Sequence, residues 1–189
     1  MTILFLCSGN TCRSPMAIAA WRSLERCDDK PFGDDVQVRS AGLAAQSAQS
    51  GKRDCVPASR HAQKVAKSWG EDLASHRAHG LSSSLLEECD FIITMTDDQA
   101  RAMRNYFGYQ PQQVRCLGEF LPDEISTDED KRLLELLESR VVATRTSRDL
   151  VDPYGGSLEA YQSCGAQIRG AIIGLRGALR NGELSHSEL

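Results

Sequence analysis

A thiol and a guanidinium stand close together near the start of the chain, in the segment Cys7-Ser-Gly-Asn-Thr-Cys-Arg13-Ser-Pro. A thiolate attacks phosphorus, and a guanidinium can donate two hydrogen bonds to phosphoryl oxygens through the transition state. The segment follows the apolar run Ile3 to Leu6 and opens a helical pattern. A loop between a strand and a helix directs backbone N–H groups and the positive end of the helix dipole at one point. The pattern predicts a phosphate-binding loop with Cys7 as nucleophile and Arg13 as a second catalytic residue.

The other residues of this loop complete the predicted anion site. Its field favours the thiolate over the thiol, and Ser14 is placed to donate a hydrogen bond to that thiolate. Pro15 suits the first helical turn, where no N–H is needed. A cysteine and an arginine at this spacing also occur by chance, and the strand before them and the helix after them favour the phosphate loop. The predicted phosphate-binding residues are Ser8, Gly9, Asn10, Thr11, Cys12, Arg13 and Ser14.

A cysteine phosphatase needs an acid, because the leaving atom must be protonated and a water molecule must later be activated. Asp152 is the best candidate, since Pro153 restricts its backbone to extended geometry and the glycines that follow allow a close approach to a neighbouring segment. Asp-Pro and Gly-Gly are also common turn dipeptides. The local sequence alone therefore leaves a plain turn equally open.

The loop Cys-x-Gly-Asn-x-Cys-Arg-Ser-Pro resembles that of the low-molecular-weight protein tyrosine phosphatase family, and the match is complete. Lesser matches extend the resemblance over most of the chain, apart from one insert. The resemblance implies that Asp152 is the general acid, in an Asp-Pro-aromatic loop late in the chain, and that Tyr154 is a wall of the substrate cleft. It also implies that Ser40 and His76 support the loop by hydrogen bonds to Asn10.

Thr11 departs from the tyrosine phosphatase pattern, which usually has a larger aliphatic residue there. Protein arginine phosphatases resemble this chain in having threonine. The threonine hydroxyl can form a hydrogen bond with a polar guanidinium, and threonine gives an aromatic ring less apolar contact than a larger aliphatic residue. We therefore expect protein phosphoarginine as the substrate. Gly155 and Gly156 favour the same subgroup, and the segment after Gly42 lacks an aromatic residue that would sandwich phosphotyrosine. The alternative for Thr11 is a loop position used mainly for its backbone.

Three alternatives to a phosphoarginine phosphatase are considered at this point. A tyrosine phosphatase of the same family would use the same chemistry. A thiol-coupled arsenate reductase would use a similar anion loop but needs a relay of two further cysteines near the third strand, where Cys89 stands without a close partner. A phosphate-binding module without activity would not need both Cys7 and Asp152.

Composition agrees with an enzyme of the cytoplasm. The 189 residues suffice for one domain with a real core, and the net charge of −4 gives no reason to expect nucleic acid. No apolar run approaches the ~18 residues of a membrane span, and no leader is evident. The 7 cysteines lack paired metal spacing, so we expect reduced thiols, no metal and no cofactor. Cys12 would either form a reversible disulfide with Cys7 or fill the buried side of the loop. The expected partners are phosphorylated proteins, and the oligomeric state stays open.

Apolar runs alternate with helical patterns along the chain. The predicted strands span residues 3–6, 36–39, 91–95 and 114–117, and the last helix runs from Leu158 to Leu179 with apolar residues three and four apart. Strands joined by crossover helices lie parallel. We expect a single doubly wound α/β domain over residues 1–180, with a four-stranded parallel sheet, helices on both faces and the phosphate loop after strand 1.

Two segments do not follow this alternation of strands and helices. Residues 121–148 form an insert that predicts an acidic amphipathic helix, capped by Ser126 or Thr127. This helix would pack on its own domain, or else dock a partner or shield the cleft. Residues 181–189 form a polar tail that we expect to fray.

Overall fold

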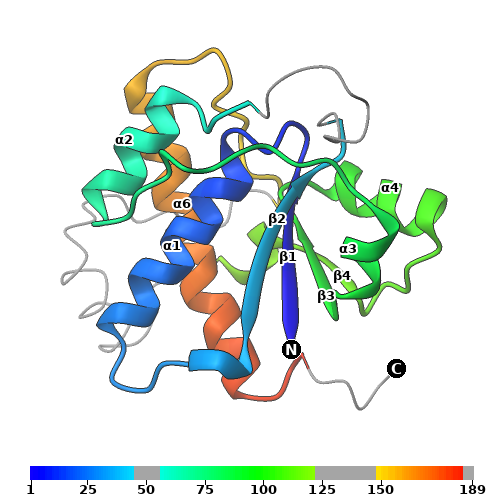
Figure 1. Cartoon of the computed structure of the whole chain (residues 1–189). Coiled ribbons are helices and arrows are strands. Elements are labelled where there is room, and N and C mark those ends of the chain that lie inside the picture. The colour runs from blue at the N-terminus through cyan, green and yellow to red at the C-terminus, as the bar shows by residue number, and fades with distance from the viewer. Residues whose placement is uncertain (45–55, 122–147, 185–189) are drawn as a thin grey trace.

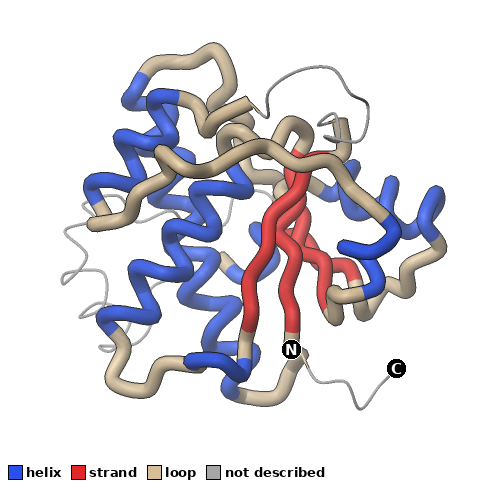
Figure 2. The backbone as a smooth tube through the Cα atoms, viewed as in Figure 1, coloured by secondary structure: helices blue, strands red, loops and turns tan. Residues whose placement is uncertain are grey.

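The computed structural model describes residues 1–44, 56–121 and 148–184. Four strands form the sheet: β1 (Thr2–Cys7), β2 (Gln37–Gly42), β3 (Phe91–Thr94) and β4 (Val114–Cys116). The α-helices of the described residues are α1 (Arg13–Cys27), α2 (Arg60–Ser68), α3 (Ser83–Glu87), α4 (Asp97–Phe107) and α6 (Leu158–Arg180). In the same part of the chain, the 3-10 helix η1 (Gly33–Asp35) precedes β2 and the 3-10 helix η3 (Leu117–Phe120) follows β4 (Figures 1 and 2). Each predicted strand is present, with ends that agree to within three residues.

The sheet has the order β2-β1-β3-β4, and every pair of neighbouring strands is parallel. The chain moves from β1 to β2 on one side and then crosses to β3 on the other side of β1. In open α/β sheets, ligands bind beyond the carboxyl ends of the strands at such a reversal point. Cys7 is the last residue of β1, so the sheet delivers it to that position.

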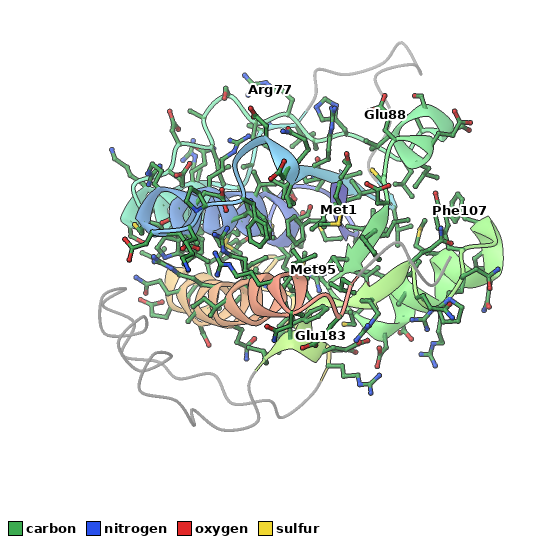
Figure 3. The ribbon with its side chains drawn as sticks, turned by 90° about the horizontal axis from the view of Figure 1, so that it is seen from below. Met1, Arg77, Glu88, Met95, Phe107 and Glu183 are labelled. Atoms are coloured by element: carbon green, nitrogen blue, oxygen red, sulfur yellow. The ribbon has the colours of Figure 1, made fainter. Side chains whose placement is uncertain are left out.

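Helices cover both faces of the sheet, which confirms the predicted fold class. On one face, Ile3 and Phe5 of β1 share a buried core with α1 and α6. On the other face, Leu4 and Leu6 pack with α4 and with residues of α3. Figure 3, seen from below, shows α1 and α6 on one side of the strands and α3 and α4 on the other. Because both faces are covered, the side chains of β1 from Ile3 to Cys7 are all buried.

The four described residues after α6, 181–184, differ from the predicted frayed tail. After α6, the N–H of Gly182 donates to Leu179 and the N–H of Glu183 donates to Ala178, with Gly182 at a φ of 75°. This is a Schellman motif, in which a left-handed glycine closes the helix. It turns Leu184 back into the core formed by α1 and α6, where that side chain is buried. Residues 181–184 therefore form a defined turn and are not frayed as expected, although Asn181, Gly182 and Glu183 are exposed, and residues 185–189 lie outside the described part of the chain.

The predicted insert lies almost wholly outside the described residues. Its two described ends both meet the sheet: Leu121 packs in the core with α6, and the carbonyl of Arg148 accepts a hydrogen bond from the Cys116 thiol. Leu150 then donates its N–H to the carbonyl of Met95 at the end of β3. This contact brings residues 150–157, the loop that carries Asp152 and is called the acid loop below, to the carboxyl edge of the sheet.

Candidate active site

The thiol of Cys7 lies at the bottom of the loop between β1 and α1. It is 3% exposed, and its Sγ receives the backbone N–H of Asn10 at 3.3 Å. Ser14 Oγ lies 3.0 Å from the same sulfur. Both neighbours can donate a hydrogen bond to the sulfur, so the loop holds the nucleophile in one place.

Asn10 shapes this loop from within. It is fully buried and has a φ of 52°, the one left-handed residue other than glycine among those described. Gly9, which the sequence places in the turn, does not have a positive φ. The Asn10 side chain accepts the N–H of His79 through Oδ1 at 2.9 Å and donates from Nδ2 to Ser14 Oγ at 2.9 Å. Since Ser14 Oγ accepts this bond, its own proton can point to the sulfur of Cys7 at 3.0 Å or to the carbonyl of Ala41 at 3.4 Å.

A strap of residues 76–80 holds the loop from outside. His76 donates from Nε2 to the carbonyl of Asn10 at 2.7 Å, and this bond fixes the tautomer of the ring. Burial, with nearby His79 and Arg77, lowers the pKa of His76 below its usual value. The neutral ring keeps the Nε2–H that the bond requires. The structure thus brings His76 to the loop.

Ser40 is not brought to Asn10. It lies on β2 beside Phe5, and no hydrogen bond joins it to Asn10 in the described part of the chain. The amide oxygen of Asn10 is taken by the N–H of His79 instead. The neighbour of Ser40, Ala41, offers its carbonyl to Ser14 Oγ at 3.4 Å. Strand β2 therefore contacts the loop through its backbone.

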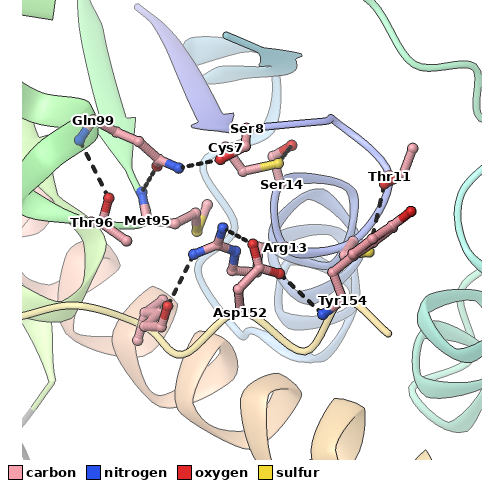
Figure 4. A network of polar contacts seen from close by, with 12 residues as sticks. Cys7, Ser8, Thr11, Arg13, Ser14, Met95, Thr96, Gln99, Asp152 and Tyr154 are labelled. Carbon is pink, nitrogen blue, oxygen red and sulfur yellow. Dashed lines mark hydrogen bonds and ion pairs between the residues drawn. The ribbon is translucent and has the colours of Figure 1, made fainter. Parts of the chain in front are cut away.

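Arg13 links the phosphate loop to the acid loop. Its side chain is 4% exposed, Nη1 donates to the carbonyl of Leu150 at 3.0 Å, and Nη2 forms an ion pair with Asp152 (Figure 4). Asp152 is 46% exposed, and its Oδ1 accepts the backbone N–H of Tyr154 at 3.1 Å. The sequence predicts both charged residues but gives no sign that they contact each other. A phosphoryl group bound by Arg13 would lie beside the Asp152 carboxyl.

The turn after Asp152 depends on its glycines. Gly155 has a φ of 75°, and Gly156 donates its N–H to the carbonyl of Pro153 at 2.9 Å. A Cβ on Gly156 would lie 3.0 Å from that carbonyl oxygen, closer than most real contacts. The turn leaves Tyr154 78% exposed at the mouth of the site.

A cleft of about 460 Å³ opens above the phosphate loop. It combines the nucleophile, the arginine, the acid and the aromatic residue predicted from the sequence with residues of the segment before α2. The lining residues are Cys7, Ser8, Gly9, Thr11, Cys12, Arg13, Ala44, Val56, Pro57, Ser59, Asp152 and Tyr154. The Thr11 carbonyl accepts the N–H of Ser59 at 2.8 Å, so its backbone is tied to the start of α2. Its side chain lines the cleft.

Gln99 belongs to the site although sequence reasoning missed it. It is 6% exposed, donates from Nε2 to Ser8 Oγ at 3.1 Å and accepts the N–H of Met95 through Oε1 at 3.0 Å (Figure 4). Thr96 accepts the N–H of Gln99, so the pair Thr96-x-x-Gln99 has the spacing of a capping box. This spacing is the one sign in the sequence that Gln99 has a defined role. A capping box, however, predicts that the Gln99 side chain binds the backbone of Thr96, and it does not predict a contact with the phosphate loop.

The other cysteines near the loop are buried. Cys12 Sγ lies 3.1 Å from the hydroxyl of Tyr161, and burial together with this contact raises the pKa of Tyr161 to about 12. Burial also raises the pKa of Cys164 to about 12. A reversible disulfide between Cys7 and Cys12 stays a prediction.

One group of side chains has the composition of a metal site. The ligand atoms of Asp97, Cys116 and Asp149 lie within 4.8 Å of one another in the described part of the chain. The Cys116 thiol donates to the carbonyl of Arg148, and burial raises its pKa to about 12. A metal would first have to displace that proton, so the group is a poor site. The expectation that the reaction needs no metal stays a prediction.

A parallel α/β sheet with a thiol at its reversal point, a buried arginine and a facing carboxyl has the features of a cysteine-dependent phosphatase. The sequence profile of the family described as low molecular weight phosphotyrosine protein phosphatase matches residues 2–136. The chain belongs to this family and is an enzyme of the protein phosphatase class.

Relatives within the family differ in their named substrates. The chain is 31% identical over 163 residues to a protein-arginine-phosphatase of Bacillus subtilis (strain 168), covering 86% of this chain and 85% of that protein. It is 33% identical to a probable low molecular weight protein-tyrosine-phosphatase, EpsP, of Ralstonia nicotianae, covering 73% of this chain and 85% of that protein. A solved YwlE arginine phosphatase, a mutant with a phosphorylated active site serine in place of cysteine, is similar with a TM-score of 0.70 and 25% identity, covering 98% of this chain and 100% of that one.

Across the described ranges, we find no helix with both the length and the apolar character needed to cross a bilayer.

Proposed function

We propose that the enzyme hydrolyses phosphoarginine in proteins through a phosphocysteine intermediate. The observation that carries the choice of substrate is Thr11, whose small polar side chain lines the cleft where the family's tyrosine phosphatases usually have a larger aliphatic one. The named activity of the Bacillus subtilis relative supports the same substrate. A guanidinium can donate to the Thr11 hydroxyl, whereas an aromatic ring gains little from it.

The proposed reaction has two steps. The Cys7 thiolate attacks phosphorus, the S–P bond forms and the P–N bond breaks, while Asp152 gives its proton to the departing guanidine nitrogen. Water then attacks the phosphocysteine, Asp152 takes a proton from this water, and the S–P bond breaks to release phosphate and the thiolate. Arg13 and the backbone N–H groups of the loop hold the phosphoryl oxygens in both steps. The phosphorylated serine of the solved relative supports the cysteine position as the site of the covalent bond.

Tyrosine phosphatase activity is the second candidate, and the exposed ring of Tyr154 favours it. This ring stands at the mouth of the cleft, where it could pack on a substrate ring. The Ralstonia relative supports this alternative.

Arsenate reduction is disfavoured by the position of Cys89. This residue lies near the amino end of β1, since the next residue, Asp90, donates its N–H to the carbonyl of Thr2. Cys7 is at the other end of that strand, roughly 16 Å away at the rise of a β-strand. Burial also raises the pKa of the Cys89 thiol to about 11. A thiol relay from Cys7 through Cys89 would have to span the sheet.

A pair of Thr11 variants tests the choice of substrate. Thr11→Ile should raise kcat/KM for a phosphotyrosine peptide and lower it for a matched phosphoarginine peptide, because it adds a methylene and removes the hydroxyl. Together the two changes should be worth roughly 1.5 to 4 kcal/mol, so the ratio should move by about ten- to several-hundred-fold. Thr11→Val is the matched control that removes the hydroxyl and keeps the shape, and it should lower only the phosphoarginine rate. If the ratio of the two kcat/KM values is unchanged in both variants, the Thr11 side chain does not select the substrate and only its backbone matters.

The setting of the enzyme is also part of the proposal. A nucleophilic thiol works only when reduced, which agrees with a cytoplasmic enzyme that acts on phosphorylated proteins. We keep residues 1–180 as the proposed phosphatase domain, with residues 121–148 as its insert.

A further inference from the structure

Gln99 donates a hydrogen bond to the hydroxyl oxygen of Ser8, and its other contacts prevent it from accepting one from Ser8. A glutamine amide can be placed in either of two orientations, and the partners decide between them. Here one partner is the backbone N–H of Met95, which can only donate, so the oxygen of Gln99 must face it. The nitrogen of Gln99 must then face Ser8 Oγ, and the serine oxygen must accept.

This arrangement leaves the hydroxyl proton of Ser8 uncommitted. Ser8 lines the cleft and is exposed. Among the residues that the structure describes, its hydroxyl donates to none. A similar arrangement is present deeper in the loop, where Asn10 donates to Ser14 Oγ and leaves the Ser14 proton for the sulfur of Cys7 or the carbonyl of Ala41.

Gln99 is well supported for such a role. Its side chain is almost fully buried, its backbone N–H is capped by Thr96 Oγ1 at 3.3 Å, and it lies in the first turn of α4. Figure 4 shows the path from Thr96 through Gln99 to Ser8. A change of rotamer would leave the N–H of Met95 unpaired in a buried place, which is costly.

We propose that Gln99 is a positioning residue that keeps Ser8 as a hydrogen-bond donor for a phosphoryl oxygen in the cleft. The proposal rests on the proposed function, because it adds a side-chain donor to the backbone donors of the same phosphate loop. A phosphoryl group is the fitting ligand, since its oxygens accept hydrogen bonds and a guanidinium has only donors.

Serine variants test the donor directly, with inorganic phosphate as the ligand and its dissociation constant measured by calorimetry. Ser8→Ala should weaken phosphate binding by about tenfold, the effect of one hydrogen bond to a charged group. Ser8→Thr keeps the hydroxyl and should bind within about twofold of wild type. Phosphate is the product with either phosphorylated side chain, so this test does not depend on the choice between arginine and tyrosine. Equal binding by wild type and Ser8→Ala would overturn the proposal.

A double-mutant cycle tests the positioning by Gln99. Gln99→Glu keeps the shape and the acceptor for Met95, but a carboxylate makes Ser8 donate to it and so turns the proton away from the cleft. Its added charge also repels phosphate, and this repulsion acts with or without the serine hydroxyl. We therefore expect Gln99→Glu to weaken phosphate binding several-fold more in the Ser8 enzyme than in the Ser8→Ala enzyme. Equal losses in both backgrounds, at unchanged melting temperature, would show repulsion alone and overturn the role of Gln99.

Discussion

The phosphate loop and the acid loop line the same cleft, but they are held in different ways. Cys7, Asn10 and Ser14 are buried and are joined to one another and to the strap by hydrogen bonds. In the acid loop, Val151, Asp152 and Tyr154 are exposed, and the Asp152 carboxyl is held by Arg13 and by one backbone N–H. Phosphate binding needs donors that are already in place, whereas proton transfer and substrate choice need groups that the substrate can reach. We therefore expect that substitutions in the acid loop lower turnover without weakening phosphate binding, and that substitutions in the phosphate loop act on binding or stability.

Removal of the nucleophile should cause the largest loss of activity while phosphate binding by the loop is kept. Cys7→Ser should abolish turnover, because a serine hydroxyl at this position is a much poorer nucleophile than a thiolate. Binding of phosphate or vanadate should stay largely intact, since the N–H groups and Arg13 remain. Turnover of an aryl phosphate can be compared with that of a mock preparation, and calorimetry gives the binding. Hydrolysis by the variant above the mock level would show that Cys7 is not the nucleophile.

Removal of the acid should have the next largest effect. Asp152→Asn should lower kcat by about 10²-fold or more, as expected for a positioned general acid, and should change phosphate affinity little. The loss should shrink across a series of aryl phosphates as the leaving group becomes a weaker base. Equal losses across that series would remove Asp152 from the acid role, and a large loss of phosphate affinity would break the separation of the two loops.

A change inside the phosphate loop should cost stability. Asn10→Ala removes two side-chain hydrogen bonds and places alanine at a φ of 52°. We expect a loss of about 2 to 4 kcal/mol in the free energy of unfolding. Asn10→Gly loses the same bonds without the backbone strain, so it should lose about 1 kcal/mol less. Denaturant titration measures both, and a wild-type stability for Asn10→Ala would contradict the account of this loop.

The pH dependence of stability should show the smallest effect. The pKa of His76 is lowered in the folded protein, so below pH 6.5 the unfolded state binds a proton that the folded state does not. Stability should therefore fall as the pH drops from 7.5 toward the folded pKa. His76→Gln keeps an N–H donor for the Asn10 carbonyl but does not titrate, so its unfolding free energy should fall less between pH 7.5 and about 5.5. Parallel pH profiles for the two proteins would argue against His76 as the titrating group.

The sequence predicts those features whose residues are neighbours along the chain. The nine residues from Cys7 to Pro15 encode a strand end, a loop and a helix start in one run, and the buried strands follow from their apolar patterns. Asp152 needed the family resemblance, because Asp-Pro by itself also predicts a turn.

The misses have a common physical cause. Gln99 meets Ser8 across 91 positions of sequence, and Arg13 meets Asp152 across 139. Such contacts depend on how the strands are ordered and on which way each side chain points, and no local spacing records this. The burial of Leu184 depends on the left-handed turn at Gly182. The resemblance implies a hydrogen bond from Ser40 to Asn10, and the structure has the backbone N–H of His79 on the Asn10 side chain.

The central claim is a cysteine phosphatase whose cleft admits a guanidinium in preference to an aromatic ring. The most direct measurement is kcat/KM of the wild-type enzyme on peptides of one sequence that carry either phosphoarginine or phosphotyrosine. The account predicts a clear preference for phosphoarginine, with turnover that depends on Cys7 and Asp152. A preference for phosphotyrosine would contradict the proposed substrate and would leave a tyrosine phosphatase with the same two loops.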